Sequence, residues 1–124
     1  MRVLDIYENY CWSFECDNPV ALRQLRVAAA FPDAAVRDAE LDSIPRSNAY
    51  RLVGDAVAFE LADDFFDEIS VEYTPTVLKR MLLGQKTNRW LKPDGNLCLP
   101  EAESETPEHG EPYIPLRRPA FATA

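Results

Sequence analysis

The stretch AYRLVGDAVAFELADDFFDEISVEY, residues 49–73, decides the fold that the sequence predicts. Apolar and polar residues alternate in three parts of it, at residues 50–53, 57–61 and 69–73. Because neighbouring side chains of a strand point to opposite faces of a sheet, this period of two predicts strands. The stretch therefore predicts a three-stranded antiparallel meander with one apolar face and one acidic face.

The charged residues in and around this stretch are sorted into blocks. Residues 55–72 contain seven acids and no base, residues 79–92 contain bases and no acid, and residues 101–111 contain five glutamates and no Lys or Arg. Blocks of like charge make fields that reach a partner, whereas interspersed charges largely cancel within a Debye length. The pattern indicates recognition through surface charge.

The segments before this stretch predict two strands and two helices. Alternation at residues 2–7 and 10–15 favours a pair of strands. Asn18 followed by Pro19 is a strong helix start, and Asp33 can cap a second, shorter helix that ends at residues 43–45. In this second helix Val36 and Leu41 are the expected buried positions. The arginines of both helices, Arg23, Arg26 and Arg37, are expected in solvent.

The segment after this stretch predicts a third helix and a hairpin. Thr74-Pro75 repeats the cap-and-proline signal, and Gly84 is placed to end the helix. An apolar stripe on this helix is expected to face the core: Val77, Leu78, Met81 and Leu82. Pro93-Asp94-Gly95-Asn96 is a turn signal that predicts a small hairpin across residues 90–99.

These elements predict an α+β fold: an antiparallel sheet of about five strands with two or three helices packed on one face. Residues 1–100 form the single globular domain, and residues 101–124 form an acidic, Pro-containing C-terminal tail. The end of the tail turns apolar again, and it either docks on the domain or stays apart from it. The residues through which it would dock are Tyr113, Ile114, Leu116 and Phe121.

No catalytic residue, metal site or cofactor is predicted. The one histidine, His109, lies among glutamates, which favour a charged imidazolium over a general base. Cys11 and Cys16 are five residues apart in a predicted strand, so their sulfurs point to opposite faces and do not form a zinc motif. The acidic residues 63–68 lack the glycine and the alternating ligands of a calcium loop.

Composition restricts the location and the partners. A net charge of −8 opposes direct binding to nucleic acid. No apolar run approaches the roughly 20 residues that a membrane-spanning helix needs, so no membrane contact is expected. Three cysteines cannot all pair within one chain, which fits reduced thiols and a cytoplasmic protein.

The function predicted from these features is that of a non-enzymatic, acidic protein-binding module. An inhibitor that covers the basic, nucleic-acid-binding surface of a partner protein has this character, and so do immunity and anti-defence proteins. The predicted partner-binding residues are Glu60, Asp63, Asp64, Phe65, Phe66, Asp67, Glu68 and Glu72. The alternative for the charges is internal pairing of Lys79, Arg80, Lys86 and Arg89 with Glu60, Glu68 and Glu72, with at least one of the two phenylalanines in the core.

Two other functions stay open on the sequence. One is a small enzyme or ligand-binding domain with a pocket between sheet and helices, lined by Tyr10, Trp12 and Tyr73. The other is a subunit of a larger assembly, for which a self-complementary patch is the evidence.

Overall fold

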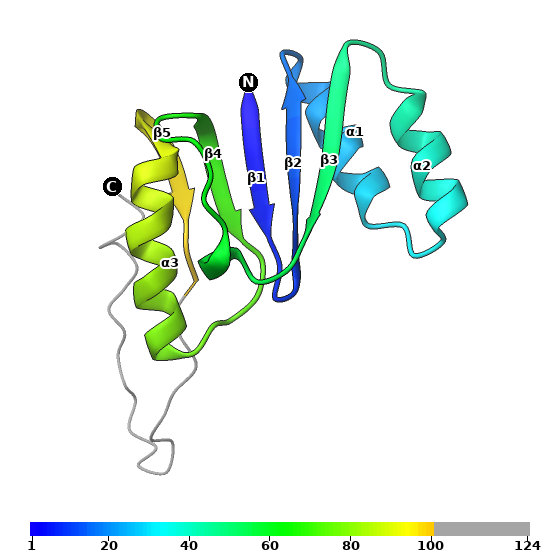
Figure 1. Ribbon diagram of the computed structural model, residues 1–124. Coiled ribbons are helices and arrows are strands. Elements are labelled where there is room, and N and C mark those ends of the chain that lie inside the picture. Colours follow the sequence, from blue (N-terminus) through cyan, green and yellow to red (C-terminus); the bar gives the residue numbers. More distant parts are fainter. Residues whose placement is uncertain (101–124) are drawn as a thin grey trace.

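The computed structural model describes residues 1–100, and the predicted tail lies outside the described residues. A five-stranded sheet with the strand order β3-β2-β1-β4-β5 carries three α-helices, which confirms the α+β class (Figure 1). The elements in chain order are β1 (Arg2–Ile6), β2 (Tyr10–Cys16), α1 (Pro19–Ala29), α2 (Ala34–Asp42), β3 (Ser47–Val53), the 3₁₀ turn η1 (Ala56–Ala58), β4 (Phe66–Val71), α3 (Val77–Trp90) and β5 (Leu91–Cys98).

The sheet is mixed, so the prediction of an antiparallel sheet was wrong. β1, β2 and β3 pair antiparallel, whereas β4 is parallel to both β1 and β5. Parallel neighbours need a long crossover connection, and α3 provides it between β4 and β5. The predicted meander was also wrong, because β3 pairs with β2 while β4 pairs with β1 and β5. Residues 57–61 are not a strand but begin in η1, where the Asp55 carboxylate accepts a hydrogen bond from the backbone N–H of Val57.

Helices cover both faces of the sheet, which corrects the prediction that they share one face. In β1, Val3 points toward α1, whereas Leu4 and Ile6 point toward α3. The core is therefore divided in two. Trp12, Phe14, Leu22 and Leu25 are buried on the α1 side, while Ile69, Leu83, Trp90 and Leu97 are buried on the α3 side. The two cysteines of β2, Cys11 and Cys16, belong to opposite halves, as their spacing predicted.

The local signals for α1 and α2 are confirmed. The side chain of Asn18 accepts hydrogen bonds from two backbone N–H groups of α1, at 2.8 and 3.2 Å. The Asp33 carboxylate accepts one from Val36 of α2, at 3.0 Å. These caps satisfy backbone donors that have no partner within the helix. Val36 itself is exposed, and only Leu41 of the two expected core positions of α2 is partly buried.

Two glycines near α3 do not act as the sequence predicted. Gly84 does not end the helix; it is buried within α3, which continues to Trp90. Gly95 does not form a hairpin turn but lies inside β5, where a Cβ atom would meet the carbonyl oxygen of Asp67 at 2.9 Å. Its missing side chain therefore permits β5 to approach β4 at the irregular register between Phe66 and Glu68.

No helix within residues 1–100 is long and apolar enough to cross a membrane.

Candidate functional site

Within residues 1–100, part of the acidic block pairs with the basic block. Three of its seven acids form ion pairs with four bases of α3 and β5: Lys79–Asp55 at 2.6 Å, Lys86–Glu60 at 2.8 Å, Arg89–Glu60 at 3.9 Å and Lys92–Asp67 at 3.1 Å. The pairing of Lys86 and Arg89 with Glu60 agrees with the predicted internal pairing, whereas Lys79 pairs with Asp55 and Glu68 pairs with Arg26 instead. Such partly exposed pairs contribute at most about 1 kcal/mol each, so they hold these segments together only weakly.

Four of the predicted partner-binding residues have structural roles. Phe66 is 3% exposed and lies in the core on the α3 side. The Asp67 carboxylate accepts a hydrogen bond from the backbone N–H of Arg2 at 2.8 Å, and this bond lowers the pKa of Asp67 below its ordinary value. Glu68 pairs with Arg26 at 3.0 Å, and Glu72 accepts a hydrogen bond from the hydroxyl of Ser70.

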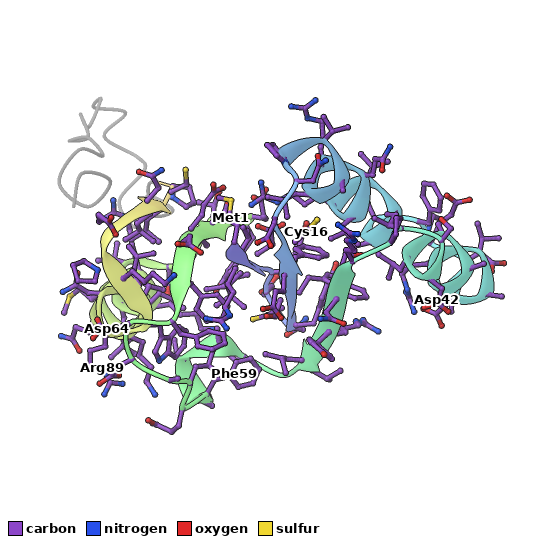
Figure 2. All side chains as sticks on the ribbon, turned by 90° about the horizontal axis from the view of Figure 1, so that it is seen from above. Met1, Cys16, Asp42, Phe59, Asp64 and Arg89 are labelled. Atoms are coloured by element: carbon purple, nitrogen blue, oxygen red, sulfur yellow. The ribbon has the colours of Figure 1, made fainter. Side chains whose placement is uncertain are left out.

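Asp63 and Asp64 are the members of the predicted site that remain available. Both are exposed, and within residues 1–100 neither carboxylate has a hydrogen bond or an ion pair. The turn that carries them is fixed by its backbone, since the N–H groups of Asp64 and Phe65 donate to the carbonyl oxygens of Arg89 and Trp90 at 2.9 and 2.8 Å. Figure 2 shows Asp64 beside Arg89 at the α3 end of the molecule.

Phe65 lies next to this turn and is half-buried. Its ring contacts Phe66 edge to face, with ring centroids 5.0 Å apart, and the guanidinium of Arg2 lies 4.3 Å from its centroid. Phe65 therefore offers a partner only part of one ring.

A buried ion pair that the sequence did not reveal lies on the sheet face that α1 covers. Arg26 of α1 donates two hydrogen bonds to Asp5 of β1, at 3.0 and 2.8 Å, and a third to Glu68 of β4. Asp5 is 4% exposed. Burial raises the pKa of Asp5 above its ordinary value, and Arg26 opposes this rise. Arg26 was expected in solvent, so that prediction was wrong. All three groups are already paired, and we assign them a structural role.

The pocket predicted from Tyr10, Trp12 and Tyr73 does not form. Tyr10 and Trp12 pack on the α1 side of the sheet, and Tyr73 packs on the α3 side. Trp12 is covered by Arg37, whose guanidinium lies 5.7 Å from its ring. In the part of the chain that the structure describes, no group of three or more His, Cys, Asp or Glu residues is placed to hold a metal ion.

An apolar surface on α3 is exposed, although the sequence predicted that it faces the core. Four large side chains were expected in the core but are exposed: Val77 (46%), Leu78 (63%), Met81 (54%) and Leu82 (39%). Their spacing of one, three and four residues places them along one side of the helix. We call these four residues the α3 apolar surface. The opposite side of α3, with Leu83, Gly84, Thr87 and Trp90, faces the core instead.

The sequence did contain a signal for the correct orientation of α3. Leu83 and Trp90 are seven residues apart, two helical turns, and so define a second apolar side. Interpreting Gly84 as the end of the helix removed Thr87 and Trp90 from it and left only the stripe that is in fact exposed.

The chain has no match among the family models, curated proteins and solved structures with which it was compared. Its function is therefore argued from the surfaces described above.

Proposed function

We propose that this chain is a non-enzymatic protein-binding module and that it contacts its partner through the α3 apolar surface. The observation that carries the proposal is the exposure of four large apolar side chains together on one side of one helix. Single exposed apolar residues are ordinary on a protein surface, but contiguous apolar patches mark interaction sites.

The energetics favour a partner of apolar character. Fully burying a Val, Leu or Met side chain gains about 1.5–3 kcal/mol. These four side chains are between about two fifths and two thirds exposed, so covering them supplies several kcal/mol. Met81 adds a flexible thioether that adapts to irregular partner surfaces.

The charges beside the α3 apolar surface are largely neutralised. Lys79 pairs with Asp55, and Lys86 pairs with Glu60. Binding at this surface is therefore expected to depend little on ionic strength, because few unpaired charges lie at its rim.

A second candidate function is supported by a different observation, the two unpaired carboxylates of Asp63 and Asp64. With a net charge of −8 for the chain, they favour an inhibitor that covers a basic surface of a partner, as immunity and anti-defence proteins do. The contact would consist of Asp63, Asp64 and the accessible edge of Phe65. Such binding is steered by charge and weakens as salt is raised.

Capture of partners from a lysate of the source cells, at low and at high salt, tests both candidates. Leu78→Ser/Met81→Ser is expected to abolish capture at both salt concentrations. The matched control Val20→Ser/Val27→Ser changes two apolar residues of α1 that are 58% and 57% exposed, and it is expected to have no effect.

Asp63→Lys/Asp64→Lys tests the acidic alternative in the same assay. Capture that falls with salt and is lost in this charge-reversal variant, yet survives Leu78→Ser/Met81→Ser, would replace the first function with the second.

A further inference from the structure

The described part of the chain ends against α3. The carbonyl oxygen of Pro100 accepts a hydrogen bond from Nε of Arg80 at 2.9 Å. Arg80 belongs to the first half of α3, and its side chain leaves the helix on another side than those of Leu78 and Met81. Because a helix with its side chains is about 10–12 Å across, the α3 apolar surface lies only a short distance around the helix from Pro100.

The remaining sequence contains an apolar segment of suitable character. Residues 112–121 include four large apolar side chains, Tyr113, Ile114, Leu116 and Phe121, together with three prolines. Proline disrupts helices and favours an extended conformation, whose ordering on an apolar surface costs less conformational entropy.

The connecting sequence is long enough to bring this segment to α3. Twelve residues separate Pro100 from Tyr113, and at about 3.3 Å per residue they reach up to about 40 Å. Val77 and Leu82 are five residues apart in a helix, about 8 Å at 1.5 Å per residue. A tether of this length also holds the segment at an effective concentration on the order of millimolar.

The connection and α3 carry opposite charges. Residues 101–111 contain five glutamates and no Lys or Arg, and α3 contains four bases and no acid. Three of these bases, Lys79, Lys86 and Arg89, already pair with Asp55 and Glu60, so the attraction between the two segments is weak and docking depends on the apolar side chains.

We propose that residues 112–121 bind the α3 apolar surface of the same chain and occupy it until a partner displaces them. This inference rests on the proposed function in one respect, that the α3 apolar surface is a protein-binding surface. A variant in which residues 112–121 bind α3 more weakly is then expected to bind its partner more tightly, because the segment competes less with the partner for the same surface.

The oxidation of the two methionines by hydrogen peroxide in the full chain, followed by mass spectrometry, tests the proposal. Met81 belongs to the α3 apolar surface, and Met1, 44% exposed, serves as the reference within the same molecule. The variant Ile114→Ser/Leu116→Ser is expected to raise the ratio of the Met81 rate to the Met1 rate by about tenfold, which corresponds to about 1.4 kcal/mol of docking free energy. The control Ala122→Ser/Ala124→Ser, outside the segment, is expected to leave the ratio unchanged.

An equal ratio in the wild type and in Ile114→Ser/Leu116→Ser overturns the proposal. Protection of Met81 that persists in this variant and disappears on dilution also overturns it, because it identifies a second copy of the chain as the occupant.

The outcome is separable from that of the proposed function. If Met81 is unprotected but Leu78→Ser/Met81→Ser still abolishes partner capture, only the inference about the segment fails. If Met81 is protected by the segment but capture is unaffected by the same variant, only the assignment of the partner contact fails.

Discussion

Replacing Arg26 with methionine removes the only cation that pairs with the buried carboxylate of Asp5 within residues 1–100. Arg26 makes two of its three hydrogen bonds to Asp5, which is 4% exposed. Methionine keeps much of the volume and the helix propensity of the arginine stem, so the substitution tests chiefly the charge.

The size of the expected loss follows from the burial of the two partners. Removing one partner of a fully buried ion pair costs about 3–5 kcal/mol. The side chain of Arg26 is 31% exposed, so solvent screens part of the interaction, and we expect a loss of about 2 kcal/mol at pH 7.

The loss is expected to depend on pH in a defined direction. Without Arg26, burial and the neighbouring carboxylates of Glu72 and Glu68 raise the pKa of Asp5 further above its ordinary value of 3.8. The folded state then binds a proton more readily than the unfolded state, so stability falls as the pH rises from the ordinary pKa through the folded one. The deficit of Arg26→Met relative to the wild type should therefore be smallest near the ordinary pKa and largest at neutral pH.

Urea unfolding followed by the fluorescence of the buried Trp12 and Trp90 measures this effect across the pH range. Arg23→Met, an exposed arginine of the same helix, is the matched control and should be near neutral. Asp5→Val/Arg26→Met replaces the whole pair by apolar side chains and should recover most of the loss, because neither charge is left buried. An Arg26→Met variant that is no less stable than Arg23→Met, or a deficit that is the same at every pH, would show that the charge of Arg26 does not stabilise buried Asp5.

Three further predictions concern the core, the reactivity of the thiols and the dependence of stability on acidic pH. Leu83→Ala should cost about 3 kcal/mol of unfolding free energy and Leu78→Ala less than about 1 kcal/mol, because only Leu83 is buried; equal losses would contradict the observed orientation of α3. In the native protein a thiol reagent such as DTNB should label Cys98 alone, because Cys11 and Cys16 are buried and burial raises the pKa of Cys11 to about 12; rapid labelling of a second thiol would contradict this. Asp67→Asn should destabilise the protein by about 1 kcal/mol at pH 7. The backbone N–H of Arg2 lowers the pKa of Asp67, so the stabilisation is present above the ordinary value of 3.8 and is lost as the pH falls through the folded pKa. An Asp67→Asn deficit that persists at the lowest pH of a urea titration would contradict this origin.

The features that the sequence predicted correctly depend on neighbouring residues. Asn18 and Asp33 cap the helices that follow them, and alternation over residues 2–15 produced the β1–β2 pair. The choice of strand partners is not local. The sequence of residues 66–71 does not indicate that β4 pairs with β1, which lies more than 60 residues earlier in the chain. The pairing of Asp5 with Arg26 is likewise hidden, because two separate elements must pack before the groups meet.

The prediction of the binding site was incomplete for the same reason, because it depends on contacts between elements that are distant in the sequence. Local charge blocks identified Asp63 and Asp64, and the alternative of internal pairing included Glu60 with Lys86 and Arg89, but the pairing of Asp67 with Lys92 of β5 became visible only in the fold. The exposed position of Leu78 and Met81 depends on which side of α3 faces the sheet. That side is decided by Trp90, beyond the glycine that was expected to end the helix.

Photo-crosslinking is the most direct test of whether the α3 apolar surface binds protein. The photoreactive amino acid p-benzoylphenylalanine is placed in the full chain instead of Leu78 and, as a control of similar exposure, instead of Val27 of α1 (63% and 57% exposed). After irradiation in a lysate of the source cells, the crosslinked peptides are identified by mass spectrometry. We expect crosslinks from the Leu78 position to a partner protein and, in the purified chain, to residues 112–121. Crosslinks that are equally frequent from both positions, or absent from the Leu78 position, would contradict this expectation.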